Sequence, residues 1–254
     1  MTNQDKVAVV TGASQGIGRG IALRLADDGY KIAILDRQAS DETVKMIQDK
    51  GNKAWQGQVD ISDPDSVAEV FGRMKDEFGP AYALVNAAGI FADEPFLETT
   101  AETWDKVMAV NARGPFLAAQ QAAMQMKDNG AGRIINILSN ASFQGFAYES
   151  AYCASKGAAL LLTRVLAIEL AQYGITVNGV GPGTVNTAMG GNYLERGPIA
   201  GHELSRTPLG RFGEPEDIAE AVAFFTTSAS WVTGQALYVD GGFTATGLPV
   251  LEGM

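Results

Sequence analysis

The sequence predicts an α/β fold in which a doubly wound, parallel, seven-stranded sheet is covered by helices on both faces. Seven short runs of apolar and β-branched residues recur along the chain, and longer stretches with helical apolar spacing separate them. The short runs are nearly continuous in apolar character, which is typical of strands buried on both faces. No Pro/Gly/Ser-rich linker and no short-period repeat interrupts this alternation. We therefore expect a single domain spanning residues 1–254.

The order of the predicted elements supports parallel pairing, since a crossover helix separates each strand from the next. The predicted strands are 7–11 (VAVVT), 31–35 (KIAIL), 54–59, 82–86 (YALVN), 133–138 (RIINIL), 175–180 (ITVNGV) and 236–239 (ALYV). The predicted helices lie near 17–28, 40–50, 64–78, 101–127, 151–172 and 215–227.

The predicted helix at 151–172 is apolar on nearly all of its faces. A helix that lies on a sheet needs only one apolar stripe, so a second apolar face suggests a partner. We expect a homo-oligomer, a dimer or a tetramer, that uses this helix. A deeply buried helix in a monomer is the alternative.

Two segments fit no regular element. Segment 188–207 follows a predicted strand and is rich in glycine, which favours a mobile lid. His202 within it either contacts substrate or lies on the surface. The tail 242–254 is either a frayed terminus or part of a subunit contact.

Composition excludes several classes of function. The chain carries 19 Lys and Arg against 29 Asp and Glu, for a net charge of −10, which argues against nucleic-acid binding. With one histidine and one cysteine it lacks the usual zinc ligands, so we expect no metal. A single cysteine forms no internal disulfide. The beginning MTNQDKVAVV has no signal-peptide pattern, and no apolar run approaches the ~20 residues of a membrane span. We expect a cytoplasmic protein without a membrane partner.

The glycine-rich segment TGASQGIG at 11–18 directly follows the first predicted strand and opens a helix. Its glycines allow a tight turn and a close approach of the backbone to a pyrophosphate, while the helix N-terminus supplies N–H donors. The spacing G-x-x-x-G-x-G differs from G-x-G-x-x-G, and no Lys-Ser/Thr pair of a P-loop follows. The position still indicates a dinucleotide site on a Rossmann fold.

Asp36 follows the second predicted strand, at the position where an acidic residue binds the adenosine ribose hydroxyls in NAD sites. Because a 2′-phosphate there would meet a carboxylate at close range, Asp36 favours NAD over NADP. Arg37 follows at once and would soften that preference. A solvated aspartate at a strand end is the alternative.

Further motifs in the same order resemble those of the short-chain dehydrogenase/reductase family over residues 5–243. TGASQGIG is similar to the TGxxxGIG turn of that family, Asn86-Ala87-Ala88-Gly89 is similar to NNAG, and Tyr152 with Lys156 matches YxxxK. Ala87 replaces an asparagine, which leaves the backbone free to line the cofactor groove. Ser142 stands where relatives often carry glycine, so its hydroxyl either faces substrate or completes a local turn.

The resemblance implies catalytic roles for Asn111, Ser139, Tyr152 and Lys156 and assigns Lys156 to the nicotinamide ribose. The cofactor-binding residues that the motifs and the resemblance imply are Gly12, Ser14, Gln15, Gly16, Ile17, Gly18, Asp36, Asp60, Ile61, Asn86, Ala87, Gly89, Tyr152, Lys156, Pro182, Gly183, Val185 and Thr187. It also implies a water held by Asn111 that links Lys156 to solvent.

The spacing of Tyr152 and Lys156 suits acid–base chemistry. At positions i and i+4 they project from one helix face. A nearby ammonium stabilises phenolate and lowers a tyrosine pKa from its ordinary value near ~10. Ser139 follows the fifth strand, where it can hydrogen-bond a substrate oxygen as charge develops. Cys153 lies between the pair as a packing residue.

We therefore predict an NAD(H)-dependent oxidoreductase that interconverts a secondary alcohol and a ketone, with a polyol, a sugar or a related hydroxy compound as substrate. One alternative is an NADPH-dependent 3-oxoacyl-thioester reductase, which would need basic residues such as Arg196 and Arg206 beside the cleft. The other is a non-enzymatic NAD-binding regulator, although such a protein could have lost Tyr152 or Lys156 and this chain has both.

Overall fold

The structure of the protein is a computed structural model, and residues 3–189 and 198–245 of it are described. Its seven strands form one all-parallel sheet in the order β3-β2-β1-β4-β5-β6-β7, and each confirms a predicted strand within two residues at either end. They are β1 (Val7–Thr11), β2 (Lys31–Asp36), β3 (Ala54–Gln58), β4 (Ala81–Asn86), β5 (Gly132–Ile137), β6 (Ile175–Pro182) and β7 (Ala236–Val239).

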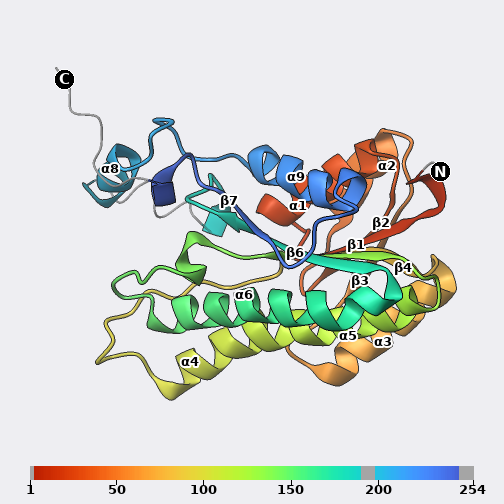
Figure 1. Cartoon of the computed structure of the whole chain (residues 1–254), viewed down its shortest axis with the longest axis horizontal. Helices are drawn as coiled ribbons and strands as arrows, with labels where there is room; N and C mark the ends of the chain where they lie inside the picture. Colours follow the sequence, from red (N-terminus) through yellow and green to blue (C-terminus); the bar gives the residue numbers. More distant parts are fainter. Residues whose placement is uncertain (1–2, 190–197, 246–254) are drawn as a thin grey trace.

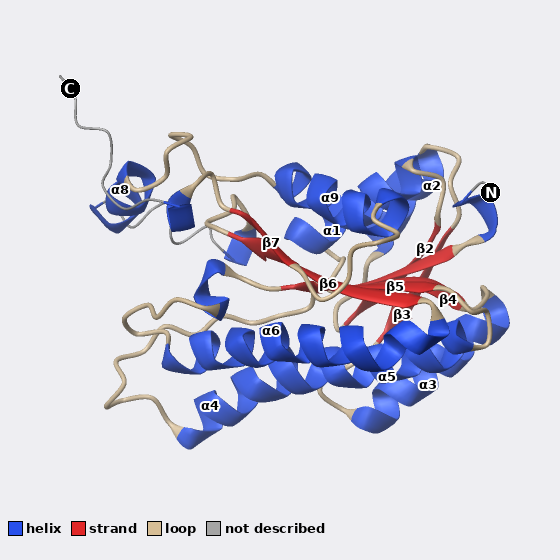
Figure 2. Cartoon of the chain, viewed as in Figure 1, coloured by secondary structure: helices blue, strands red, loops and turns tan. Residues whose placement is uncertain are grey.

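Helices cover both faces of this sheet, as Figures 1 and 2 show. One face carries α1 (Gly16–Asp27), α2 (Asp41–Asp49) and α9 (Pro215–Ala223). The other carries α3 (Pro64–Glu77), α4 (Ala101–Met108), α5 (Gly114–Lys127) and α6 (Ser150–Leu170). The short α8 (Pro198–Ser205) lies apart from both layers. The doubly wound prediction is confirmed.

Strand β1 shows why the apolar runs are continuous. Ala8 and Val10 pack into the core beneath α1 and α9, while Val7 and Val9 pack into the core beneath α3 and α5. Successive side chains of a strand point to opposite faces, so a strand that is covered on both sides needs apolar residues at every position.

The sheet has a switch point between β1 and β4. Strand order runs outward in one direction through β2 and β3 and in the other through β5, β6 and β7. In open parallel sheets, ligands bind beyond the carboxyl ends of the strands at such a point. The residues that follow β1, β4 and β5 are therefore the first place to look for a site.

The predicted helix at 101–127 is continuous but not uniform. A π-helical turn, Ala109–Arg113, joins α4 to α5 and contains Asn111. Apolar spacing does not reveal one extra residue per turn, so the sequence predicted one ordinary helix here. Such π-turns are frequent at functional sites.

Helix α6 and the short 3₁₀ turn after it, Ser150–Tyr173, form one helix that is long and apolar enough to cross a membrane by length and composition. This corrects the expectation that no segment qualifies. The helix packs on β6 and buries Lys156 and Thr163, so the sheet gives one face a partner. Its other face exposes Leu161, Val165 and Ile168.

Candidate active site

The glycine-rich turn between β1 and α1 adopts a conformation that only glycine accepts without strain. Gly12 has φ +71° and Gly16 has φ +56°. A Cβ on Gly12 would lie 2.6 Å from the Cα of Ala88, and one on Gly18 would lie 2.2 Å from the Gly12 carbonyl oxygen. The close packing brings the turn against the β4 loop, and it leaves at the start of α1 a backbone cradle that fits a pyrophosphate.

Thr11 ties this turn to the loop after β4. Its Oγ1 accepts hydrogen bonds from the backbone N–H groups of Ala87 and Ala88, both at 3.1 Å. The predicted site did not include Thr11, although its position at the end of the first strand was a usable signal. Because these are backbone contacts, the replacement of asparagine by Ala87 leaves them intact.

Asp36 ends β2 and lines the same cleft. Its Oδ2 accepts a hydrogen bond from the Ser14 N–H at 2.9 Å, and its Oδ1 accepts one from the Gln38 N–H at 2.9 Å. The Asp36 carboxylate thus holds the glycine-rich turn in place. It is therefore not merely a solvated aspartate at the end of a strand, which was the alternative interpretation. Each oxygen keeps a lone pair for a further donor. Arg37 beside it is exposed.

Asp60 and Ile61 line the cleft just after β3. Asp60 Oδ1 accepts hydrogen bonds from the Ser62 N–H at 2.9 Å and the Ser62 hydroxyl at 2.6 Å. These bonds hold the pKa of the Asp60 carboxyl below its ordinary value. The side chain is a fixed anion at neutral pH.

Asn86 does not lie in the cleft. Its Nδ2 donates to Asn136 Oδ1 at 2.8 Å, and Asn136 in turn donates to Thr163 Oγ1 at 2.8 Å. This buried chain of amides joins β4, β5 and α6. The Asn86 side chain is therefore engaged within the sheet, and a role of Asn86 toward a cofactor stays a prediction.

Asn111 also lies behind the cleft rather than in its wall. Its amide holds Ile90 from both sides, accepting from the N–H and donating to the carbonyl at 2.8 Å each, and donates to Ser155 Oγ at 3.1 Å. A Cβ on Gly89 would lie 3.4 Å from Asn111 Oδ1 and 3.9 Å from Lys156 Nζ. The π-turn thus brings Asn111 to Lys156.

Ser139, Tyr152 and Lys156 meet at the other end of the cleft. The Lys156 ammonium is buried, donates to the Ile137 carbonyl at 2.9 Å and lies 5.7 Å from the centroid of the Tyr152 ring. Phe91 packs edge-on against that ring, with the centroids 4.9 Å apart. Two side chains from α6 and one from the end of β5 therefore converge.

Burial disfavours the charged forms of both Tyr152 and Lys156 on α6. It raises the pKa of Tyr152 to about 12, against an opposing interaction with Ser139, although the ring keeps partial exposure. It lowers the pKa of Lys156 to about 8. The expected lowering of the Tyr152 pKa by Lys156 is absent in this arrangement, because desolvation dominates.

Ser142 completes a local turn, which decides between its two alternatives. Its hydroxyl accepts a hydrogen bond from the Ser139 N–H at 3.1 Å, and Ser139 Oγ accepts from the Ala141 N–H at 3.1 Å. The two serines form a capping box on a short 3₁₀ turn, Asn140–Ser142. Ser142 therefore acts on the site by holding Ser139.

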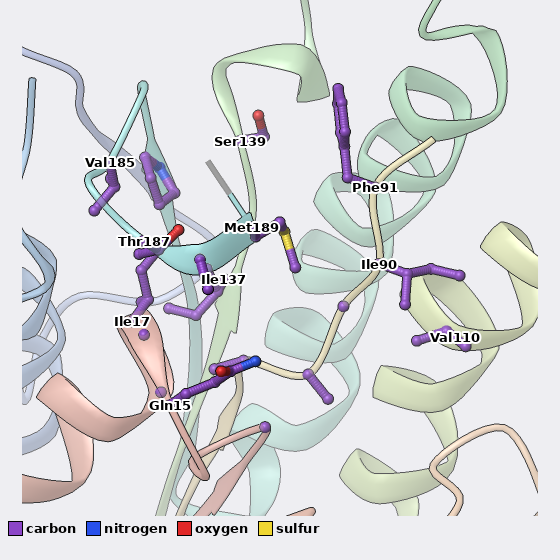
Figure 3. Close-up of a pocket in the computed structure, with 18 of the residues that line it drawn as sticks. Gln15, Ile17, Ile90, Phe91, Val110, Ile137, Ser139, Val185, Thr187 and Met189 are labelled. Carbon is purple, nitrogen blue, oxygen red and sulfur yellow. The ribbon is translucent and has the colours of Figure 1, made fainter. Parts of the chain in front are cut away.

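The cleft that joins these groups has a volume of about 460 Å³. Figure 3 shows Gln15 and Ile17 at one end, Ser139 and Phe91 at the other, and Thr187 and Met189 between them. Every residue proposed for the site lines the cleft except Asn86 and Asn111; the set is Gly12, Ser14, Gln15, Gly16, Ile17, Gly18, Asp36, Asp60, Ile61, Ala87, Gly89, Ser139, Tyr152, Lys156, Pro182, Gly183, Val185 and Thr187. A glycine cradle and an acid–base cluster thus face one continuous space.

The predicted lid is described in part. Ala188, Met189 and Glu203 line the cleft, and α8 occupies the second half of the segment. His202 on α8 is exposed and also lines a neighbouring chamber. Both alternatives for it, a contact with substrate and a surface position, therefore stay open. Residues 190–197, with Arg196, and residues 246–254 of the tail lie outside the described part.

Comparison with known proteins gives consistent matches over nearly the whole chain. The family model described as enoyl-(acyl carrier protein) reductase matches residues 12–244. A short-chain dehydrogenase/reductase of Armillaria gallica is 40% identical over 252 residues, which cover 94% of this chain and 96% of the relative. A 3-oxoacyl-(acyl-carrier-protein) reductase, FabG, of Staphylococcus epidermidis is 37% identical over 242 residues, which cover 94% and 98%.

This chain is also similar to a solved structure. It is a putative 2-deoxy-D-gluconate 3-dehydrogenase from Agrobacterium tumefaciens with bound NADP. The two chains are 36% identical, with coverage of 96% of this chain and 98% of the other, and they superimpose with a TM-score of 0.90. This likeness covers nearly the whole chain.

Proposed function

The chain belongs to the short-chain dehydrogenase/reductase family of oxidoreductases, which bind a nicotinamide cofactor, and we propose that it is an NAD(H)-dependent enzyme that interconverts a secondary alcohol and a ketone. One observation carries this proposal: Ser139, Tyr152 and Lys156 face the same cleft as the glycine turn and Asp36. The substrate we propose is a small polyol, a sugar or a related hydroxy compound.

The preference for NAD rests on Asp36. Its two oxygens accept bonds from Ser14 and Gln38, so the carboxylate is held beside the glycine-rich turn, where we expect the adenosine ribose to bind. Ribose hydroxyls can donate to it, whereas a 2′-phosphate would be repelled at close range. The structural neighbour with bound NADP makes this a choice to be tested in this chain, since Arg37 lies next to Asp36.

The bound nicotinamide would supply the acceptor for the hydride that leaves the carbinol carbon. Ser139 Oγ would hydrogen-bond the substrate oxygen, and the Tyr152 oxygen, as phenolate, would take the hydroxyl proton, so that the alcohol loses one hydride and one proton and becomes a ketone. Lys156 would stabilise the phenolate. In the reverse direction, the neutral phenol, favoured by a pKa of about 12, would return the proton.

Asn111 would act behind this set. Its amide bonds to Ile90 and Ser155 tie the loop after β4, beside which Lys156 lies, to α6. The proton relay to solvent that the resemblance implies would start from Lys156.

The second candidate is an acyl-thioester reductase. The FabG relative, 37% identical, favours it. The two candidate enzymes would differ in their cofactor and in the charge of their substrate. The carboxylates of Glu149 and Glu203, which line the cleft, favour a neutral substrate. A regulator that only binds NAD has no observation in its favour, since Tyr152 and Lys156 both face the cleft.

We also propose a homo-oligomer built on α6. Leu161, Val165 and Ile168 are exposed on one face of this helix, with Ile168 79% exposed. Large apolar side chains gathered on one helix face mark an interaction surface.

Initial rates of NAD and NADP reduction, measured over polyols, sugars and simple secondary alcohols, test the proposed activity. We expect turnover with NAD that falls below detection in Tyr152→Phe, a variant that keeps the ring and its contact with Phe91 but lacks the hydroxyl. A clear preference for NADP would contradict the role of Asp36. If no alcohol and no ketone were turned over with either cofactor, the regulator would become the better interpretation.

A further inference from the structure

A second chamber adjoins the cleft on the substrate side. Its volume is about 650 Å³, and Phe146, Glu149 and Glu203 line both spaces. Glu149 immediately precedes α6, three residues before Tyr152. The chamber therefore extends the cleft outward from the reacting end, and a substrate longer than a simple alcohol would enter it.

The wall of this chamber is acidic. Among the described residues that line it, Asp93, Glu149 and Glu203 carry carboxylates, whereas Arg206 carries the fixed positive charge. Burial is the main cause of the raised pKa of the Tyr152 phenol, and the charge of Glu149 adds to it, so Glu149 acts on the proposed reacting group. The Arg206 guanidinium lies over the Phe243 ring, 4.5 Å from its centroid.

Glu203 is the carboxylate that is best placed to bind substrate. Its Oε2 accepts a hydrogen bond from Thr184 Oγ1 at 2.7 Å, which links α8 to the turn after β6. A carboxylate has about four acceptor positions, and in the described part of the chain no protein donor reaches Oε1. Since Glu203 lines the cleft and the chamber, that oxygen is available to a ligand that spans both.

We propose that Glu203, with Glu149 beside it, is a specificity-determining residue that accepts hydrogen bonds from substrate hydroxyls remote from the reacting carbon. The enzyme then selects a neutral polyhydroxy compound over the matching carboxylate anion. This inference rests on the proposed function, because it takes Tyr152 as the reacting end. It goes beyond that function by excluding sugar acids and acidic thioesters as preferred substrates.

The physical basis is the asymmetry between hydroxyls and anions at a carboxylate. A hydroxyl donates to a carboxylate in a charge-assisted bond, whereas an anion brings no donor and repels it. Loss of one such bond costs a substrate about tenfold to a hundredfold in affinity.

The test uses D-glucitol and D-gluconate, which differ only in a terminal CH₂OH or carboxylate. Each is titrated calorimetrically into protein saturated with NADH or NADPH, whichever binds more tightly, since the reduced cofactor prevents oxidation of the ligand. We expect glucitol to bind at least about tenfold more tightly than gluconate. Glu203→Gln should weaken the binding of glucitol by about tenfold to a hundredfold. It should also reduce the difference between the dissociation constants of glucitol and gluconate.

Matched variants complete the design. Glu69→Gln removes the same charge from the exposed face of α3 and should leave both dissociation constants unchanged. Glu149→Gln should also reduce the difference between the two dissociation constants. It replaces Glu203→Gln in the test if that variant fails to fold, as judged by thermal unfolding. The inference is overturned if gluconate binds as tightly as glucitol, if neither binds, or if the Glu203 and Glu149 variants bind glucitol as the wild type does.

Turnover separates this inference from the proposed function. If glucitol binds in the expected pattern but no alcohol is oxidised, the proposed activity fails and the selective chamber stands. If alcohols are oxidised but glucitol binding does not depend on either glutamate, the activity stands and the inference fails.

Discussion

Lys156 donates its ammonium hydrogen bond to the main-chain carbonyl of Ile137, 2.9 Å away. The lysine is 7% exposed and, within the described residues, no carboxylate pairs with it, so the fold holds a buried cation through one neutral acceptor. Burial of that kind disfavours the charged form and lowers the pKa to about 8. The proposed reaction centre is thus built at the expense of stability.

Replacement of Lys156 by methionine should therefore stabilise the protein while it removes activity. Lowering a lysine pKa from 10.5 to about 8 corresponds to about 3 kcal/mol against the folded, charged state. We expect Lys156→Met to raise the free energy of unfolding at pH 7 by about 1–3 kcal/mol, because the lost bond to Ile137 offsets part of the gain. Urea unfolding measures it.

The difference in the free energy of unfolding between Lys156→Met and the wild type should depend on pH. Between pH 8 and 10.5 the unfolded chain holds the Lys156 proton while the folded chain releases it, so wild-type stability rises with pH relative to the variant. Above pH 10.5 the advantage of Lys156→Met should vanish. Lys45→Met, on the exposed face of α2, is the control and should show no such trend. A Lys156 variant less stable than wild type at pH 7 would refute the argument.

Asp36→Asn should change the choice of cofactor. The amide keeps one acceptor oxygen for the glycine turn but removes the charge that would repel a 2′-phosphate. We expect kcat/KM to fall about tenfold with NAD and to rise with NADP, which corresponds to a loss of about 1.4 kcal/mol with NAD. Steady-state rates with both cofactors measure the ratio. Asp49→Asn at the end of α2 is the matched control, and an unchanged ratio in Asp36→Asn would exclude electrostatic selection at this position.

The sequence predicted the sheet well because strands that are buried on both faces have continuous apolar runs. The run at 7–11 coincides with β1, and that at 236–239 with β7. The residues that follow strands on one edge of a parallel sheet meet by geometry, so Asp36 and Ser139 could be assigned to one cleft. The domain count and the cytoplasmic location remain predictions.

Side-chain direction was harder to predict than position. Asn86 and Asn111 occur in the expected motifs, yet both amides bond to protein partners behind the cleft. A motif gives the place along the chain, whereas the rotamer is decided by which buried polar groups need a partner. The chamber around Glu203 is assembled from four separated segments, and how such segments meet is decided by the folded chain rather than by any one motif.

Gly18→Ala tests the requirement for a glycine in the turn. The new Cβ would lie 2.2 Å from the Gly12 carbonyl oxygen, so the backbone must shift. We expect a loss of about 1–3 kcal/mol in the free energy of unfolding and weaker NAD binding. Gly72→Ala in α3, where nothing lies within 4 Å of the new Cβ, is the matched change and should stabilise by about 0.5–1 kcal/mol. Denaturant unfolding and cofactor titration measure both, and equal effects would contradict the steric argument.

The exposed face of α6 predicts the effect of charge on assembly. Leu161 is 60% and Ile168 79% exposed, and a second copy that covers them would have to bury any charge placed there. We expect the wild type to elute as an oligomer in size-exclusion chromatography with light scattering. The double change Leu161→Glu and Ile168→Glu should reduce the mass to that of a smaller assembly. Met46→Glu on α2, at a residue 39% exposed, should leave the mass unchanged. A wild type of monomeric mass, or a double variant of unchanged mass, would show that the apolar face of α6 has another purpose.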